Sequence, residues 1–233
     1  MPPRLLVGAV FGASPLAEQF ERAGHTVRAL DIREDPGAVA HVDLVLLDGP
    51  SAHIRAAAEL LADHARPRQM FLHTALDEGQ QLLDDVETAQ AITMCAHNIF
   101  GNVWVTSAAD ELGETVVGLL VAEIGGMSLR IDDQVRPVIA AAQELRAMEA
   151  VVRDDAAQLL AEAVPGFDAV AQDFLEAPPG TRAAHSPEAL EQLVHAVPDP
   201  GAKRLFVDLV RRRGEVDGDT DTELWAMHKY EGG

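Results

Sequence analysis

The sequence predicts an α/β protein in which a doubly wound, mostly parallel sheet is followed by a smaller all-helical domain. In the first half of the 233 residues, short apolar runs alternate with amphipathic segments, which implies parallel strands covered by helices on both faces. After Asp132 the pattern becomes helix only. We therefore expect an α/β domain over residues 1–132 and a helical domain over residues 133–233.

The strands of the first domain are expected to be short and buried. They should lie at residues 5–11, 25–31, 42–50, 69–74, 91–97, 103–108 and 127–131. The first is apolar throughout, as a strand covered on both faces should be. Helices are expected between the first two strands, at residues 51–65 and at residues 110–124, where Gly125 and Gly126 end the last one.

The second domain should open with a long amphipathic helix over residues 134–163. Its apolar residues recur at spacings of three and four, which indicates one continuous helical stripe. The stripe contains Val138, Ala141, Leu145, Met148, Val152, Ala156, Leu159 and Ala163. Shorter helices are expected at residues 167–176, 187–196, 202–213 and 222–230. One small domain cannot cover a stripe of this length, so we expect a homodimer.

Charge and composition exclude several kinds of partner. With 38 acidic against 18 basic residues, the formal net charge is −20, which argues against nucleic acid and anionic membranes. No apolar run approaches the ~18 residues of a membrane span. The single cysteine, Cys95, suits a reducing cytoplasm, where we expect the protein. The first fourteen residues imitate a short signal peptide, but the helix that follows favours a buried strand instead.

The N-terminal segment has the order strand, small-residue turn, helix and strand ending in an acid, which is typical of dinucleotide-binding domains. If Gly8 begins the turn, Pro15 falls inside the helix at a cost of about 3 kcal/mol. If Gly12 begins it, Ser14 becomes the N-cap and Pro15 takes the first helical position. Asp31 then follows Gly12 by nineteen residues, near the spacing of a ribose-binding acid. The second register is favoured.

This turn is a weakened phosphate site. The Cβ of Ser14 intrudes where the backbone should approach a pyrophosphate, and its hydroxyl is expected to occupy amides that would otherwise face the anion. Pro15 removes one donor outright. Gly12, Ala13 and Ser14 are nevertheless the candidates for binding cofactor phosphates.

Asp31 is the candidate for binding a cofactor ribose, and an acid at this position favours NAD. Arg28 and Arg33 lie close to it in the sequence and could pair with a 2′-phosphate, so NADP stays an alternative cofactor. Asp31 can also be an ordinary polar residue at the end of a strand.

Four segments together resemble the Rossmann-like dehydrogenases of the 6-phosphogluconate dehydrogenase-like superfamily. They are ERAGHTVRAL from Glu21, DLVLLDGP from Asp43, FLHTALDEG from Phe71, and DELGETVVGLLVAEIGGMSLRIDDQVRP from Asp110. The resemblance covers about residues 4–160 and extends to a bacterial branch whose helical half has no assigned function. It implies a Rossmann domain, a helical domain that dimerises through its long first helix, and NAD(P)-dependent chemistry on a small substrate between the domains.

The resemblance also assigns residues. It places Asp48 and Gly49 in the loop over the nicotinamide and His97 at the start of the substrate loop, where Asn98 replaces a proline. His73 and Thr74 match a polar pair after the preceding strand, and Arg136 matches the start of the long helix. The candidates are His73 and His97 for catalysis, Asp48 and Gly49 for the cofactor, and Ser51, Thr74, Asn98 and Arg136 for the substrate.

Some family residues have no counterpart in the long helix. Ala140 stands where the family usually has a histidine, and Ala147-Met148 stands where it has a Ser-Asn pair. Two hypotheses therefore remain open: an NAD(P)-dependent oxidoreductase of a small metabolite, or a binding or regulatory protein that keeps the fold without the reaction.

The remaining candidate sites favour ordinary structural roles. Cys95, His97 and His73 lack a fourth zinc ligand, and the acidic segment 217–223 lacks the glycine and glutamate of a calcium loop, so we expect no metal. Each histidine follows a strand, where ligands bind in open sheets, but each can also be a polar residue of a strand–loop junction. Arg136 can pair with a substrate carboxylate or equally with Asp132 or Asp133.

Overall fold

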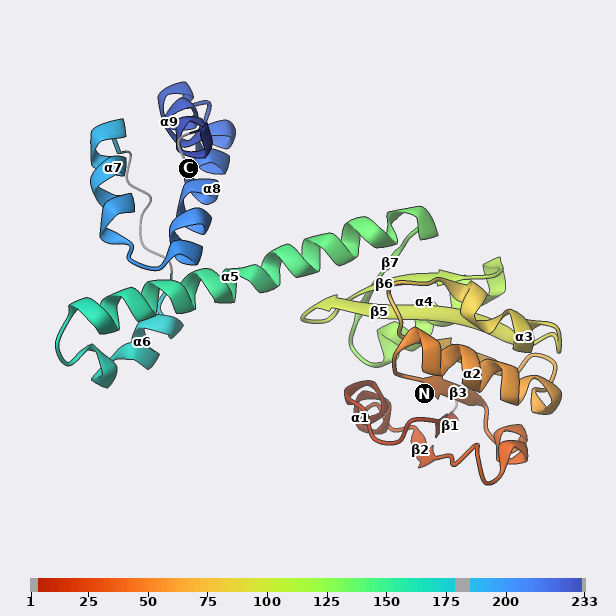
Figure 1. The fold of residues 1–233 in the computed structure, drawn as a ribbon. Coiled ribbons are helices and arrows are strands. Elements are labelled where there is room, and N and C mark those ends of the chain that lie inside the picture. The colour runs from red at the N-terminus through yellow and green to blue at the C-terminus, as the bar shows by residue number, and fades with distance from the viewer. Residues whose placement is uncertain (1–3, 179–184, 232–233) are drawn as a thin grey trace. The chain divides into compact units, whose positions relative to one another are not determined.

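The structure is a computed structural model that describes residues 4–178 and 185–231. It divides into two compact units, Met1–Arg146 and Ala147–Gly233, which are considered separately below. Figure 1 labels most helices and strands of both.

A seven-stranded sheet forms the centre of the first unit, with the strand order β2-β1-β3-β4-β5-β6-β7. The strands are β1 (Leu6–Ala9), β2 (Thr26–Ala29), β3 (Leu44–Leu47), β4 (Met70–His73), β5 (Ile92–Phe100), β6 (Val103–Ala108) and β7 (Met127–Arg130). Neighbouring strands are parallel except β5 and β6, which form an antiparallel hairpin. The predicted mostly parallel, Rossmann-like sheet is confirmed.

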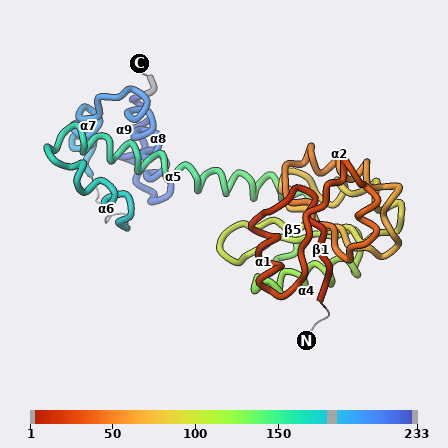
Figure 2. The backbone as a smooth tube through the Cα atoms, turned by 90° about the horizontal axis from the view of Figure 1, so that it is seen from below, coloured from red at the N-terminus to blue at the C-terminus, as the bar shows by residue number. Residues whose placement is uncertain are grey.

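Helices cover both faces of the sheet, as Figure 2 shows for α2 on one side and for α1 and α4 on the other. The helices of this unit are α1 (Pro15–Arg22), α2 (Ser51–Leu61), α3 (Asp84–Glu87) and α4 (Glu111–Glu123), with 3-10 turns at Pro36–His41, Ala62–His64, Gln80–Leu83 and Asp133–Val135. On the α2 side, Ile54 and Phe71 belong to one buried cluster. On the other side, Phe20 of α1 and Leu120 of α4 pack in a second cluster with Leu44 of β3.

The turn between β1 and α1 confirms the register in which Gly12 comes first. Gly12 has a φ of 83°, a left-handed conformation that glycine adopts readily. Ser14 is the N-cap, since its Oγ accepts a hydrogen bond from the Ala17 N–H at 3.2 Å, and Pro15 is the first helical residue. The chain therefore starts α1 with its own side chain bound to one of the amides that could face an anion.

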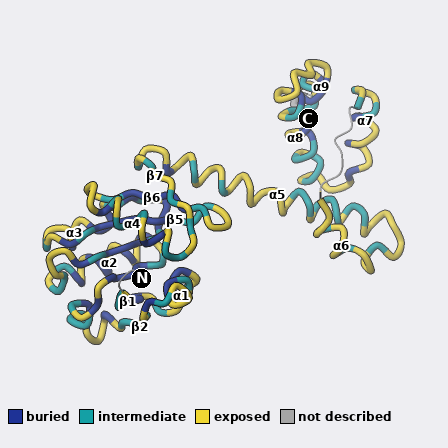
Figure 3. The backbone as a smooth tube through the Cα atoms, turned by 180° about the vertical axis from the view of Figure 1, so that it is seen from behind, coloured by how far each residue is buried: buried dark blue, intermediate teal, exposed yellow. Residues whose placement is uncertain are grey.

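The long helix α5 (Arg136–Ala163) begins in the first unit and ends in the second, because the division between the units falls at Arg146. The sequence predicts a domain boundary at residue 132, before this helix, whereas the first compact unit includes the first part of the helix and extends to Arg146. The reason is that the side chains of Arg136 and Gln143 form hydrogen bonds with residues of the sheet. Much of α5 is exposed (Figure 3), including its apolar residues Val138 at 68% and Leu145 at 75%.

The second unit is helical, as expected. Besides the end of α5 it contains α6 (Ala171–Glu176), α7 (Pro187–Ala196), α8 (Pro200–Asp217) and α9 (Thr220–Glu231), with a 3-10 turn at Phe167–Ala169. Its buried core comprises Leu190, Val194, Val207, Val210, Trp225 and Ala226. Within the described ranges, no helix has the length and apolar character needed to cross a membrane.

Helix α8 is longer than the predicted segment 202–213 at both ends. Asp199 caps its start by accepting a hydrogen bond from the Ala202 N–H at 2.7 Å, and Pro200 takes the first helical position. Its end is set by Gly218, whose φ is 69°. The acidic segment after it caps the next helix, since Asp219 accepts from the Thr222 N–H at 3.2 Å.

Candidate cofactor and substrate site

A groove of about 560 Å³ lies at the carboxyl ends of β1 and β2, beside α2. The strand order reverses between β1 and β3, and open parallel sheets bind ligands at the carboxyl ends next to such a reversal. The groove is lined by Val10, Phe11, Gly12, Ala29, Leu30, Asp31, Ile32, Arg33, His53, Ala56, Ala57 and Leu60. Two of the expected cofactor residues, Gly12 and Asp31, are therefore brought to one cavity.

Asp31 is held at the groove by its own backbone neighbours. Its Oδ1 accepts hydrogen bonds from the Arg33 N–H at 3.1 Å and from the Glu34 N–H at 3.3 Å. These bonds fix the carboxylate after β2 and use one of its two oxygens. The arrangement leaves Asp31 able to accept a hydrogen bond from a ligand hydroxyl in the groove.

The turn has few free backbone donors for a phosphate. Pro15 has no N–H, and the Ala17 N–H donates to Ser14 Oγ. Of the first three residues of α1, Leu16 is therefore the one whose N–H can still donate a hydrogen bond to an anion.

The sequence did not indicate the role of Phe11. A Cβ added to Gly49 would stand 2.9 Å from Phe11 Cδ2, so the ring lies directly against the loop after β3. The ring is 40% exposed and its centroid is 6.2 Å from that of His53. A ligand that extends from the groove to Gly49 must displace this ring.

A chain of hydrogen bonds joins the loops after β3 and β4 to α5. The Thr74 hydroxyl donates to Asp48 Oδ1 at 2.7 Å, and His97 Nδ1–H donates to the Thr74 carbonyl at 2.8 Å. The other ring nitrogen, His97 Nε2, lies 3.3 Å from Gln143 Oε1. The structure thus connects three expected residues and adds Gln143, whose amide also donates to the Asn98 carbonyl at 3.3 Å.

Arg136 is buried rather than exposed in a cleft, and of its two expected roles it takes the pairing with Asp133 rather than that of a substrate ligand. Its side chain is 2% exposed, and its Nε donates to Asp133 Oδ1 at 2.7 Å. Its Nη1 lies 3.4 Å from Cys95 Sγ, and its Nη2 donates to Ser107 Oγ at 2.5 Å. Because the guanidinium is surrounded by protein partners, it ties the start of α5 to the sheet.

His73 lies beside this guanidinium cluster, in the same row of the sheet as Cys95 and Ser107. It is fully buried, which differs from the expected position in an open site. Its Nε2–H donates to the Gly79 carbonyl at 3.0 Å, and Nδ1 has no partner among the described residues. Burial, together with the charge of Arg136, lowers the pKa of His73 to about 4, so the ring is neutral at physiological pH.

Burial also raises the pKa of the Cys95 thiol to about 11. A thiol in this environment remains protonated and is a poor nucleophile. In the part of the chain that the structure describes, no group of three or more His, Cys, Asp or Glu side chains could hold a metal ion.

Two other substrate candidates form bonds within the protein. The Ser51 hydroxyl donates to Asp77, and the Asn98 amide donates to the Gly101 carbonyl at 2.9 Å inside the β5–β6 hairpin. Of the other expected residues, Thr74 contacts Asp48 directly, and His97 contacts the Thr74 carbonyl.

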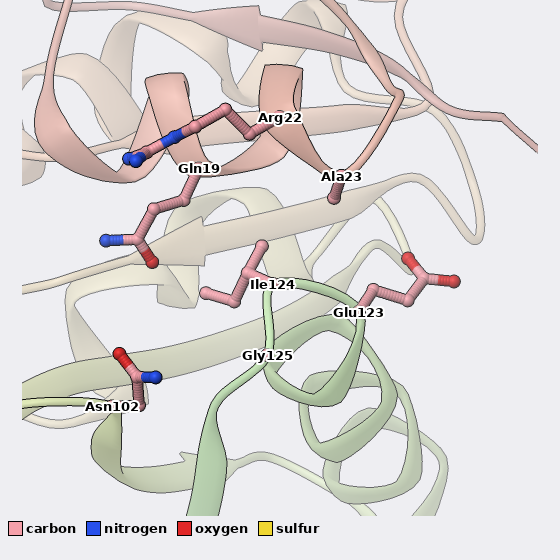
Figure 4. A pocket seen from close by; sticks show the side chains of 7 residues that line it. All are labelled: Gln19, Arg22, Ala23, Asn102, Glu123, Ile124 and Gly125. Carbon is pink, nitrogen blue, oxygen red and sulfur yellow. The ribbon is translucent and has the colours of Figure 1, made fainter.

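A second hollow lies away from these residues, at the ends of α1 and α4 (Figure 4). It has a volume of about 390 Å³ and contains both Arg22 and Glu123. Glu123 already pairs with His25, whose Nε2 is 3.0 Å from the carboxylate. No expected site residue lines this hollow.

The sheet, the groove and the helical second half define the class: a Rossmann-like α/β protein with an all-helical C-terminal region. Residues 132–229 match the family model described as 6-phosphogluconate dehydrogenase C-terminal domain-like. The predicted resemblance to the 6-phosphogluconate dehydrogenase-like superfamily is therefore confirmed. A search of curated proteins finds no match.

Solved structures share the fold at low sequence identity. Protein BF3122 of Bacteroides fragilis is 15% identical with a TM-score of 0.65, over 91% of this chain and 98% of that one. An imine reductase from Pseudomonas sp. is 14% identical with a TM-score of 0.65, over 97% and 99%. A pyrroline carboxylate reductase from Plasmodium falciparum, solved with NADP bound, is 9% identical with a TM-score of 0.56, over 98% and 97%.

Proposed function

We propose that this protein is an NAD(P)-dependent oxidoreductase of a small metabolite and that the groove beside Gly12 and Asp31 binds the cofactor. The observation that carries the proposal is the groove itself, which lies at the strand ends and has both residues on its wall. The reductases that share the fold, one of them solved with NADP bound, support the same class of function.

The residues fit the adenosine half of a dinucleotide better than its other half. Asp31 would accept hydrogen bonds from the ribose hydroxyls, which favours NAD over NADP. The apolar wall of Ile32 and Leu60 would contact the base. Toward Gly49, the ring of Phe11 must turn away before the second half of the cofactor can bind.

His97 is the residue that we assign to proton transfer. The Thr74 carbonyl oxygen can only accept a hydrogen bond, so His97 Nδ1 must carry a hydrogen. Nε2 is then the ring nitrogen that can accept a proton from a substrate or return one to it. A bound nicotinamide would supply the hydride chemistry, for which the protein needs positioning and one acid or base. Gln143 is a positioning residue, because its Oε1 lies 3.3 Å from Nε2 and accepts a hydrogen bond from that nitrogen once it carries the proton.

Thermal unfolding with NAD⁺, NADH, NADP⁺ and NADPH tests cofactor binding. A ligand at 100 times its dissociation constant should stabilise the native state by about 2.7 kcal/mol. We expect a rise in Tm that is larger for NAD⁺ and NADH than for the phosphorylated pair. Unchanged Tm values at millimolar concentrations of all four would contradict the proposal.

A second candidate function is ligand binding without catalysis. It is favoured by the internal bonding of Ser51 and Arg136 and by the burial of His73, which leave few free polar groups for a substrate. NADH oxidation by a panel of small ketones and imines distinguishes the two functions. Turnover that His97→Gln abolishes supports the oxidoreductase, whereas NADH binding with no turnover supports the second candidate.

A further inference from the structure

A separate pocket of about 470 Å³ lies in the second unit, among α7, α8 and α9. Its lining residues are Val194, His195, Pro200, Lys203, Arg204, Val207 and Lys229. The side of the pocket toward the core is apolar, because Val194 and Val207 are 5% and 6% exposed and belong to the buried cluster. The volume lies within the range of roughly 300–1,000 Å³ that is usual for small-molecule sites.

The charge of this pocket is opposite to that of the protein. The chain carries a formal net charge of −20, and its lysines are Lys203 and Lys229 alone. Both line this pocket, together with Arg204. An acidic protein therefore gathers three cations around one apolar floor.

One acidic side chain, that of Glu191, pairs with a lysine of the pocket and is already shared among several donors. Glu191 forms an ion pair with Lys229 and accepts from Trp225 Nε1–H at 3.2 Å. The hydrogen bond from Lys229 is the main cause that lowers the pKa of Glu191. Lys229 also lies over the Trp225 ring, 5.6 Å from its centroid, so this lysine is held in place.

Lys203 and Arg204 have no comparable counter-charge among the described side chains. Within residues 4–178 and 185–229, no acidic side chain lies within salt-bridge distance of either. Asp199, near them in the sequence, is occupied at the start of α8, where it accepts from the Ala202 N–H. His195 contributes no negative charge, and its Nδ1–H donates to the Glu191 carbonyl at 2.7 Å.

We propose that this pocket binds a small organic anion, a carboxylate or phosphate ester with an apolar chain. The charged head would receive hydrogen bonds from Lys203 and Arg204, and the chain would contact Val194 and Val207. Charge-assisted hydrogen bonds of this kind are shorter and stronger than neutral ones. The site is distinct from the cofactor groove, so the two proposals can fail independently.

The experiment is ¹H–¹⁵N NMR titration of the full chain with hexanoate, hexyl phosphate and hexanol. We expect saturable shifts at Val194, Lys203 and Val207 with the two anions and far weaker ones with hexanol. A response to one anion alone identifies the head group and still supports the site. No saturable shift with either anion, or equal binding of hexanol, would overturn the proposal.

Charge variants on one helix provide the matched control. Loss of two charge-assisted bonds in the Lys203→Gln, Arg204→Gln double variant should raise the Kd at least about tenfold. Arg212→Gln removes the same type of charge from α8, where Arg212 pairs with Glu215 instead, and should leave the Kd unchanged. Lys203→Arg should bind normally, which separates loss of charge from misfolding. Equal weakening by Arg212→Gln would mean non-specific attraction and contradict the site.

Discussion

At the scale of single residues, His73 has the most unusual environment. Its ring is fully buried beside the Arg136 guanidinium, and its pKa is lowered to about 4 from the ordinary value of 6.5. Between these two values the unfolded chain binds a proton that the native protein does not bind. Stability must therefore fall as the pH decreases through this window, and the effect is complete below about pH 4.

The size of this effect follows from the shift in pKa, and amounts to about 3 kcal/mol. We expect the wild type to lose this much more unfolding free energy between pH 7 and pH 4 than the variant His73→Gln, which cannot titrate. Urea unfolding of both proteins across the pH range measures the difference, while the carboxylates common to both cancel. Parallel stability curves for the two proteins would show that His73 is accessible to protons in the native state.

At the scale of elements, the start of α1 determines how the proposed cofactor site works. Ser14→Ala removes a helix cap and should cost about 1 kcal/mol of unfolding free energy, whereas Ser14→Gly should cost only a few tenths. Both variants release the Ala17 N–H, but only glycine also removes the Cβ. One additional hydrogen bond to phosphate is worth about 0.5–1.5 kcal/mol, so NAD should bind Ser14→Gly roughly three- to tenfold more tightly.

Calorimetric titration of NAD⁺ into the wild type and both Ser14 variants gives this comparison. Weaker binding to Ser14→Gly than to the wild type would mean that the hydroxyl contacts the cofactor instead of competing with it.

The start of α5 depends on the Arg136 side chain. This guanidinium holds Asp133, Cys95 and Ser107 together in a buried position. Removing one partner of a buried charge pair typically costs 3–5 kcal/mol, and we expect Arg136→Met to lose about 3 kcal/mol in denaturant unfolding. The control is Arg130→Gln, which breaks the exposed pair with Glu114 and should cost at most about 1 kcal/mol. Equal losses in the two variants would contradict a structural role for Arg136.

The elements themselves could be predicted from sequence because periodicity and capping are local signals. Ser14, Pro15 and Gly12 fix the start of α1 without help from distant residues, and the structure confirms that register. The apolar periodicity predicts a start of α8 at residue 202, whereas the Asp199-Pro200 cap, which precedes that periodicity, begins the helix earlier.

The candidate site could be predicted only in part, because it depends on contacts between segments far apart in the chain. Asp31 and Gly12 are recognisable from their spacing. The burial of Arg136 arises from residues 29 and 41 positions away, and the Phe11 ring covers a glycine from another loop. No local sequence pattern indicates such contacts. Gln143 lies 46 positions from His97, so no local pattern indicates their proximity either.

At the scale of the whole molecule, we propose that α5 mediates a homodimer. Its apolar residues Val138, Leu145 and Met148 are 68%, 75% and 46% exposed, and exposed apolar stripes of this kind commonly mark protein interfaces. Light scattering at micromolar concentration should give twice the mass of the 24.9 kDa chain. Leu145→Asp should give the single-chain mass, whereas the conservative Leu145→Met should remain a dimer. A wild type of single-chain mass would contradict this assignment.

The central claim is that NAD binds in the groove with its ribose on Asp31. Calorimetric titration of NADH into the wild type, Asp31→Ala and Glu34→Ala tests it most directly, because Glu34 is a neighbouring exposed acid that does not line the groove. Loss of charge-assisted bonds worth about 1.5–3 kcal/mol should weaken binding to Asp31→Ala at least about tenfold. Glu34→Ala should bind like the wild type. Equal affinities of all three proteins would place the cofactor elsewhere, and no heat of binding in the wild type would contradict the account itself.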